Sequence, residues 1–325
     1  APLGVVGFVF EGRPNVFADA TGVLRTGNSV VFRIGSDALG TARAISKHML
    51  VPALIASGLP DKSVVLIDSP THGAGWALFA HSGLSLAIAR GSGKAVAQLG
   101  AVARQSGTAV SLHGTGGAWM IIGQSAHAED IASFVLNSLD RKVCNTLNVV
   151  AMTLDSPANN IQAVLNGVSD AATHRNTQGV VHVHSTSKKL LDSCVIPVNV
   201  IIQWSDNIDY ALEYEWENQP ELALSFESNL HHCVASFNAH SPQFIVSCLS
   251  QDQGDHDLVW RECNAPFVGN GFTRWVDGQY ALNRPELGLS NWQGGRLLAR
   301  GGVLSGDGVH TVRLRVHQTN TNVRR

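Results

Sequence analysis

Short apolar runs of strand length alternate with helix-length stretches through the first third of the chain, and this alternation limits the possible folds more than any other feature. The apolar runs lie at residues 3–10, 29–33, 63–67, 84–89 and 109–112. Helical stretches lie between them at residues 16–24, 38–56 and 95–105, and Pro52 is expected to kink the second one. Because these strands are apolar on both faces, we expect a mostly parallel sheet covered by helices on both sides, the α/β pattern of a nucleotide-binding domain.

The second half of the chain has a different pattern. It contains a helix candidate at residues 130–139 and strand candidates at residues 180–183, 198–204 and 244–248. Residues 309–316 alternate between polar and apolar side chains. This alternation predicts a half-exposed strand whose open edge can pair with another subunit.

Composition and charge exclude several classes of protein. With 44% hydrophobic and 15% charged residues, the chain is too apolar to be disordered. Its 23 basic and 25 acidic residues give a net charge of -2 without a basic stripe, which argues against a nucleic-acid partner. The uncharged stretches at residues 69–89 and 105–128 contain histidines and many small polar residues, so we expect no membrane span.

The cysteines supply one candidate nucleophile. The chain has five widely spaced cysteines and no CxxC motif, which is typical of reduced thiols in a cytoplasmic protein. Cys144 is the best candidate, because it follows Arg141 and Lys142 and precedes a run that could begin a helix. Positive charge and a helix N-terminus both favour the thiolate. The alternative is a buried structural cysteine, which is the commoner role of this residue.

Two glycine clusters follow predicted strands, and each has two interpretations. Residues 91–93, between Arg90 and Lys94, could present backbone N–H groups to a phosphate or form a plain turn from strand to helix. The full GxGxxG pattern is absent. Residues 113–117 could mark a close approach to a ligand or a tight turn.

Histidines and carboxylates in the second half offer weaker candidates. His182 and His184 alternate along a predicted strand, but no third ligand is visible, so no metal is predicted. Glu215 and Glu217 flank Trp216, which is the pattern of a surface turn or of a contact with a cofactor ribose.

Four motifs together resemble the aldehyde dehydrogenase superfamily, and more narrowly its glutamate-5-semialdehyde dehydrogenase family, also called the gamma-glutamyl phosphate reductases. Their order and spacing match that family across nearly the whole chain. The Arg-Pro-Asn segment at residues 13–15 and the Val-Cys-Asn segment at residues 143–145 are specific to the reductase branch. The motifs are residues 2–7 with 11–16, 27–33 with 35–37, 143–147, and 272–278 with 286–290 and 296–301.

The resemblance implies a fold and an assembly. It implies a Rossmann-type NAD(P)-binding domain, present in part, over residues 1–128, and an α/β catalytic domain over residues 129–306. Residues 307–325 would form an oligomerisation strand, so we expect a homo-oligomer, either a dimer or a tetramer. Family members carry further structure before the position equivalent to Ala1, so the N-terminal part of the family fold is expected to be missing.

The resemblance also implies roles for individual residues. Cys144 would be the nucleophile, and the side chain of Asn15 would donate to the oxyanion together with the Cys144 backbone N–H. The remaining assignments are Arg33, Gly35 and Ser36 for the adenosine ribose or its phosphate, Arg90, Gly91 and Ser92 for the pyrophosphate, Glu217 (with Glu215 as a rival) for the nicotinamide ribose, and Arg13, Asn145 and Arg274 for the substrate.

The expected reaction is the NADP-dependent reduction of L-glutamyl 5-phosphate to L-glutamate 5-semialdehyde in proline biosynthesis. NADP is favoured by the resemblance and by Arg33 as a partner for its phosphate. His113 stands where hydrolytic members carry a glutamate that activates water, which favours phosphate as the acyl acceptor. Residues 237–244 depart from the family's Gly-Ser-x-His-Thr stretch. Two alternatives remain: an acylating aldehyde dehydrogenase that uses coenzyme A, and a non-catalytic assembly subunit or fragment.

Overall fold

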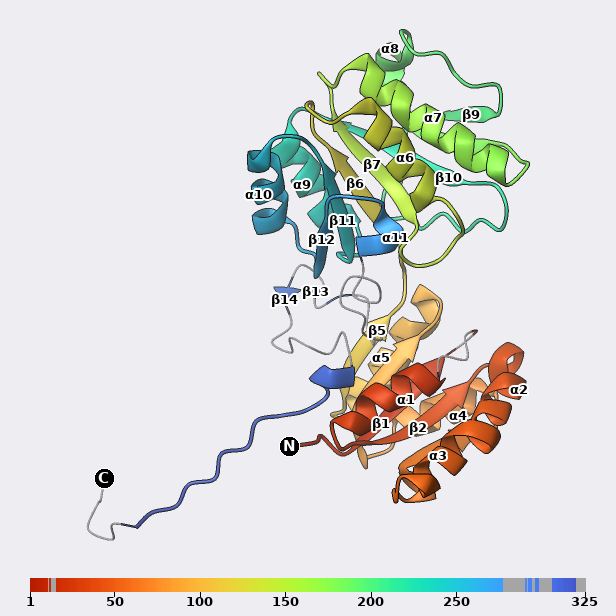
Figure 1. Cartoon of the computed structure of the whole chain (residues 1–325), viewed down its shortest axis with the longest axis vertical. Helices are drawn as coiled ribbons and strands as arrows, with labels where there is room; N and C mark the ends of the chain where they lie inside the picture. Colours follow the sequence, from red (N-terminus) through yellow and green to blue (C-terminus); the bar gives the residue numbers. More distant parts are fainter. Residues whose placement is uncertain are drawn as a thin grey trace. The chain divides into compact units, whose positions relative to one another are not determined.

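Two parallel sheets, each in its own compact unit, form the framework of the chain (Figure 1). The computed structural model describes residues 1–10, 12, 16–276, 290, 292–293, 296–297 and 306–319. The first unit comprises residues 1–90, 96–111 and 305–325, and the second comprises residues 91–95 and 112–304. Arg13 and Asn15 lie outside the described residues.

The sheet of the first unit has the strand order β3-β2-β1-β4-β5, which confirms the predicted parallel α/β pattern. The chain adds strands on one side of β1, then crosses back and adds them on the other, so right-handed crossovers place α1–α3 and α4–α5 on opposite faces. The strands are β1 (Val5–Phe10), β2 (Ser29–Ile34), β3 (Val64–Ile67), β4 (Leu84–Arg90) and β5 (Ala109–His113), and the helices are α1 (Val16–Arg25), α2 (Ser36–Ile45), α3 (Val51–Ala56), α4 (His72–Phe79) and α5 (Gly93–Gln105).

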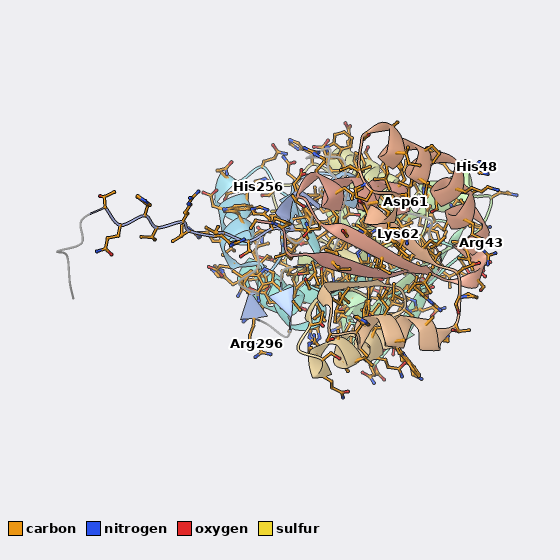
Figure 2. All side chains as sticks on the ribbon, turned by 90° about the horizontal axis from the view of Figure 1, so that it is seen from below. Arg43, His48, Asp61, Lys62, His256 and Arg296 are labelled. Carbon is orange, nitrogen blue, oxygen red and sulfur yellow. The ribbon has the colours of Figure 1, made fainter. Side chains whose placement is uncertain are left out.

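The predicted irregularity at Pro52 is present. Residues 36–56 form one helical stretch in which a π-helical turn, Ser46–Leu50, separates α2 from α3. Pro52 lacks the backbone N–H that would continue the α-helical ladder, and the wider turn accommodates this loss. The outer face of this stretch carries exposed polar side chains, among them Arg43 and His48 (Figure 2).

Aromatic residues and one buried amide hold the first unit together. Phe8 stacks on Phe32 with ring centroids 5.0 Å apart, and Phe10 meets Phe8 edge-on at 5.5 Å. The Asn28 side chain accepts hydrogen bonds from Leu3 N–H (2.7 Å) and Gly4 N–H (3.0 Å) and donates to the Val309 carbonyl (2.7 Å). This amide therefore fixes the C-terminal segment beside the start of β1.

Residues 309–316 do not form the predicted strand. The structure has a 3₁₀ turn at Gly306–Gly308 and a single bridge between Pro2 and His310, and residues 311–319 carry no regular structure. Val312, Leu314 and Val316 are 80–88% exposed. The alternating pattern describes a strand only when a neighbouring strand pairs with it, and among the described residues the backbone bridge to this segment joins Pro2 and His310.

The sheet of the second unit has the order β12-β11-β6-β7-β10-β8-β9, and all of its pairs are parallel. β6 lies in this sheet, so residues 112–128, which we assigned to the first domain, pack with the second unit. The strands are β6 (Ala118–Ile122), β7 (Leu147–Thr153), β8 (Gly179–His184), β9 (Val200–Ser205), β10 (Glu221–Glu227), β11 (Ile245–Leu249) and β12 (Phe267–Gly269), with a separate ribbon of β13 (Trp292–Gln293) and β14 (Arg296–Leu297).

The helices of the second unit cover both faces of its sheet, by the same crossover rule. They are α6 (Ala128–Ser138), α7 (Ala158–His174), α8 (Lys188–Leu191), α9 (Leu230–His240), α10 (Gln253–Glu262) and α11 (Thr273–Val276). α7 packs closely on α6 at Gly167, where a Cβ atom would lie 2.7 Å from the Ala132 carbonyl oxygen.

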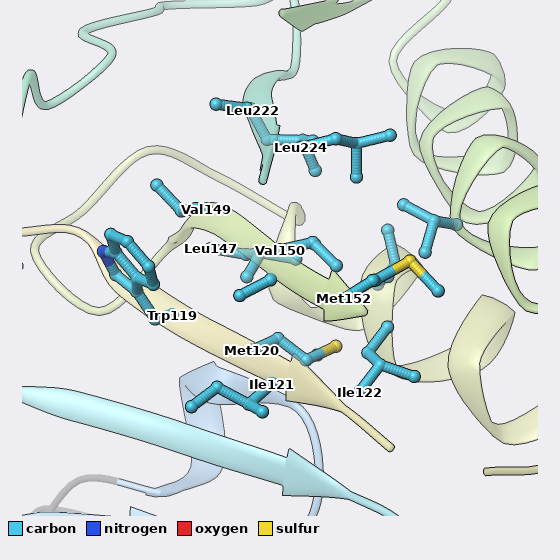
Figure 3. Packing of buried hydrophobic residues seen from close by; sticks show 14 of the residues in the cluster. Trp119, Met120, Ile121, Ile122, Leu147, Val149, Val150, Met152, Leu222 and Leu224 are labelled. Carbon is cyan, nitrogen blue, oxygen red and sulfur yellow. The ribbon is translucent and has the colours of Figure 1, made fainter. Parts of the chain in front are cut away.

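The core of the second unit centres on β6 and β7, whose side chains are all buried (Figure 3). Trp119 lies at its edge and meets Phe237 of α9 edge-on, with ring centroids 5.8 Å apart. Strands buried on both faces make a rigid platform, and the segments that precede β6 and β7 are anchored to it. No helix in the described residues has both the length and the apolar character needed to cross a membrane.

Candidate active site

Cys144 lies in a turn directly before β7. The prediction that a helix begins after it is wrong, because residues 147–153 form a strand that is buried throughout. A short, fully apolar run has the same composition in a buried strand as in a buried helix, so periodicity did not separate the two. The site at Cys144 is therefore built from the amino ends of strands.

Hydrogen bonds within the turn fix its shape. The Thr146 hydroxyl accepts from Val143 N–H at 2.8 Å and donates to the Arg141 carbonyl at 2.6 Å. Thr146 N–H donates to the Val143 carbonyl at 3.0 Å. Because one buried hydroxyl joins both ends of the turn, Cys144 is presented on a closed loop of backbone.

The glycine cluster at residues 113–117 packs against this turn. Gly117 N–H donates to the Cys144 carbonyl at 2.8 Å. A Cβ atom on Gly116 would lie 2.7 Å from both the Cα and the carbonyl oxygen of Cys144. Gly117 has a φ of +106° and lies against Asn148, which leaves no room for a side chain. The cluster is thus a close approach of two backbones, one of them carrying Cys144.

Glu213 belongs to the same site, although no sequence motif points to it. Its carboxylate accepts hydrogen bonds from Gly116 N–H and from the Lys142 ammonium. The Asn148 side chain donates to the Leu212 carbonyl at 2.8 Å and accepts from Tyr214 N–H at 3.0 Å. Lys142 and Glu213 are 71 residues apart, and only the fold brings them together.

Burial makes the other four thiols weaker candidates for a nucleophile. It raises the pKa of Cys233 and of Cys248 to about 12, with nearby carboxylates adding to the effect. Burial also raises the pKa of Cys194 and of Cys263 above the ordinary value for a thiol. A thiol held protonated is a poor nucleophile, so Cys144 is the candidate that remains.

Two predicted substrate residues from distant motifs meet beside Cys144. Arg274 donates a hydrogen bond to the Asn145 side-chain oxygen and another, at 2.7 Å, to the Asp140 carboxylate. The Thr273 hydroxyl donates to the Asn145 carbonyl at 2.8 Å. The start of α11 is therefore fastened to the Cys144 turn.

The predicted ribose glutamate, Glu217, lies apart from these contacts. Its side chain is exposed, and its carbonyl accepts from Arg175 at 2.8 Å while that guanidinium lies 5.2 Å from the centre of the Trp216 ring. The rival, Glu215, has a carboxylate oxygen 3.9 Å from the Lys142 nitrogen. Of the acidic residues in this stretch, Glu213 makes the closest contacts with the segments on both sides of Cys144.

Arg33, which is predicted to bind a cofactor phosphate, contacts backbone carbonyls of the first unit. Arg33 is 3% exposed, and its guanidinium donates to the carbonyls of Pro70 and Thr71, just before α4. Gly35 and Ser36 lie at the carboxyl end of β2, where α2 begins. Arg33 thus braces the 70–71 segment in this structure, and its predicted contact with a cofactor phosphate stays a prediction.

Arg90 ends β4, next to the central strand, and pairs with a buried carboxylate. Its guanidinium lies 3.6 Å from Asp19 and 5.3 Å from the centre of the Phe10 ring. Burial raises the pKa of Asp19 to about 6, and the charge of Arg90 partly opposes this. Gly91 N–H then donates to the His113 carbonyl, and the Ser92 hydroxyl accepts from Ala95 N–H. Residues 91–93 therefore form a turn that caps α5.

Sequence comparison identifies relatives that match nearly the whole chain. The gamma-glutamyl phosphate reductase 1 of Bacillus licheniformis is 33% identical over 309 residues, which cover 92% of this chain and 68% of that protein. The chain belongs to the gamma-glutamyl phosphate reductase family. The reductase of a Geobacillus strain is 27% identical over 305 residues. No protein-family model matches the chain.

Solved structures show the same fold as this chain in a reductase and in an aldehyde dehydrogenase. The gamma-glutamyl phosphate reductase of Thermotoga maritima superposes with a TM-score of 0.75 at 20% identity, over 98% of this chain and 73% of that one. An acetylating aldehyde dehydrogenase of Geobacillus thermoglucosidasius gives 0.70 at 16% identity. The predicted reductase family and the predicted aldehyde-dehydrogenase-like fold are both confirmed.

The sheet of the first unit has the topology of a doubly wound sheet, which is common among nucleotide-binding proteins. In a doubly wound sheet, ligands bind at the carboxyl ends of strands where the strand order reverses, here between β1 and β4. Gly35, Ser36 and Arg90 lie at the carboxyl ends of β2 and β4. No cluster of three metal-binding side chains occurs in the described residues, and His182 instead bonds Glu221 at 2.6 Å.

Proposed function

We propose that this chain catalyses the NADP-dependent reduction of L-glutamyl 5-phosphate to L-glutamate 5-semialdehyde, through a thioester on Cys144. The observation that carries the proposal is the 33% identity to a relative named gamma-glutamyl phosphate reductase. The geometry supports it, because Cys144 is presented on a closed turn, whereas burial raises the pKa of each of the other four thiols.

The first half of the reaction uses the Cys144 turn. The sulfur attacks the acyl carbon, a C–S bond forms, and the bond to the phosphate oxygen breaks, so that inorganic phosphate leaves. We expect the Cys144 backbone N–H to stabilise the negative oxygen of the tetrahedral intermediate. Such donors act where charge develops, and loss of one costs about 3 kcal/mol.

The second half releases the aldehyde. NADPH, when bound, would supply the hydride that reduces the thioester carbonyl. The resulting thiohemiacetal, on Cys144, collapses when its hydroxyl loses a proton and the C–S bond breaks, which returns the thiolate. Arg274 and Asn145 are already joined beside this turn, and we expect this pair to orient the glutamyl group.

The surroundings of Cys144 also support phosphate rather than water as the acyl acceptor. A hydrolytic enzyme needs a carboxylate that can take a proton from water. The carboxylate that the structure brings to this turn, Glu213, is engaged by the Lys142 ammonium and by Gly116 N–H. Both oxygens of this carboxylate are thus occupied by donors from the protein itself.

Gly35, Ser36 and Arg90 are the residues that would hold the dinucleotide in the first unit. The choice of NADP over NAD follows from family membership, since Arg33 is engaged by backbone carbonyls. Two alternatives have weaker support. The superposition with an acetylating aldehyde dehydrogenase concerns the fold alone, and a non-catalytic role is motivated by coverage of 68% of the relative's length.

The test runs the reaction in reverse. Purified protein receives NADP and glutamate semialdehyde with phosphate, with coenzyme A, or with neither, and absorbance at about 340 nm reports NADPH. We expect NADPH formation that requires phosphate and that disappears in Cys144→Ala. Formation that requires coenzyme A would establish the acylating alternative, and no formation with either acceptor would support the non-catalytic one.

A further inference from the structure

Glu213 connects Gly116, which packs against the Cys144 backbone, with Lys142, which lies two residues before Cys144 in the chain. One carboxylate oxygen accepts from Gly116 N–H, and the other accepts from the Lys142 ammonium. Gly116 packs on Cys144, so that a Cβ atom there would lie 2.9 Å from the Cys144 Cβ. Lys142 is two residues before Cys144 in the chain. One carboxylate therefore clamps the site from both sides.

The clamp is held rigidly by the fold. Lys142 and Glu213 are 10% and 12% exposed, so water screens their attraction only in part. Asn148, at the start of β7, bonds the main chain on both sides of Glu213. Since β7 also carries the Cys144 turn on its amino end, the clamp and the thiol share one anchor.

The clamp also sets the charge near the sulfur. The charged side chains that the structure places around this turn are Lys142, Glu213 and Glu215 on one side and Asp140, Arg141 and Arg274 on the other. Lys142 and Glu213 neutralise one another, and Arg274 and Arg141 both contact Asp140. Removal of either member of the buried pair leaves the other charge uncompensated close to Cys144.

We propose that Glu213 is a positioning residue for Cys144: with Lys142 it fixes the backbone on both sides of the thiol and balances the charge that the thiolate experiences. This role rests on the proposed use of Cys144 as the nucleophile. It differs from direct contact with substrate, since both carboxylate oxygens are engaged by the protein.

The proposal predicts shifts of opposite sign. The test measures the rate of iodoacetamide labelling of the Cys144 peptide by mass spectrometry across pH, without cofactor or substrate. Glu213→Gln leaves the ammonium uncompensated, so the midpoint of the rate curve should fall by about one pH unit. Lys142→Met leaves the carboxylate uncompensated, so the midpoint should rise by a similar amount. The double variant should return close to the wild-type midpoint.

A matched control is Glu129→Gln, which removes an exposed carboxylate at the start of α6, beyond the carboxyl end of β6. Its midpoint should match the wild type within about 0.2 pH units. Shifts of one sign in both single variants, or midpoints unchanged in both, would overturn the proposal. If Glu213→Gln fails to fold, the sign of the shift in Lys142→Met decides alone.

Steady-state kinetics separate this proposal from the proposed function. A positioning role predicts that Glu213→Gln lowers kcat at least tenfold while KM for the semialdehyde changes less than threefold. Opposite labelling shifts in a protein that has no reductase activity would leave the positioning role intact and refute the proposed function. Full reductase activity with unshifted labelling midpoints in both variants would refute the positioning role and leave the proposed function intact.

Discussion

Gly116 packs directly against the backbone of Cys144, so a side chain at position 116 is expected to disturb the nucleophile. In Gly116→Ala, the added methyl group would lie 2.7 Å from the Cα and the carbonyl oxygen of Cys144 and 2.9 Å from its Cβ. Side-chain carbons do not approach backbone atoms that closely, and backbone cannot rotate away as a flexible side chain can. The Cys144 turn must therefore shift by several tenths of an ångström.

The cost of this shift follows from packing. Overpacking a close-packed region costs about 1–3 kcal/mol of unfolding free energy. The loss of activity should exceed the loss of stability, because the backbone that moves carries the Cys144 sulfur. A displacement of about 1 Å can lower a reaction rate about 100-fold. We therefore expect Gly116→Ala to lose more activity than stability.

Two assays on one pair of variants check this. Urea unfolding gives the stability of each variant, and phosphate-dependent NADPH formation gives the activity. Gly271→Ala is the matched control in the same unit, because a Cβ atom there would meet only Phe134, at 3.9 Å. Wild-type activity in Gly116→Ala would refute the close approach of the glycine cluster to Cys144.

Three further predictions concern stability and assembly. Asn148→Ala leaves the Leu212 carbonyl and the Tyr214 N–H without their hydrogen-bond partner. The free energy of unfolding measured in urea should therefore fall by about 2–4 kcal/mol. Burial raises the pKa of Asp19 from 3.8 to about 6, so the folded state favours its protonated form. The resulting stability is present below pH 3.8 and lost as the pH rises through 6; it amounts to about 3 kcal/mol, and the pH–stability curve of Asp19→Asn should lack that step. We expect a homo-oligomer, a dimer or a tetramer, and light scattering coupled to size exclusion that reports a monomer would contradict it.

The first unit could be predicted almost completely, because its pattern is local. Each strand is a short apolar run, each connection is brief, and the helix signals at Pro52 and Gly93 lie within the segments they shape. A parallel sheet buried on both faces leaves few other arrangements. The local pattern also singled out Cys144, whereas the resemblance assigned Asn145 and Arg274 to the substrate and the structure joins them beside that cysteine.

The rest depended on contacts between distant segments. Nothing near Glu213 marks it as a partner of Lys142, and Glu217, with a tryptophan beside it, was the more conspicuous choice. β7 was missed because a doubly buried strand has no periodicity. Residues 309–316 have the alternation of a strand, but a strand needs a neighbour, and its sequence does not say which one.

The central claim is that Cys144 carries the acyl group, and trapping that group tests it most directly. The protein is mixed with L-glutamyl 5-phosphate without NADPH, quenched in acid, digested and analysed by mass spectrometry. We predict a glutamyl adduct on the peptide that contains Cys144, and none in Cys144→Ala. An adduct on another cysteine, or unmodified Cys144 under conditions in which phosphate is released, would contradict the account.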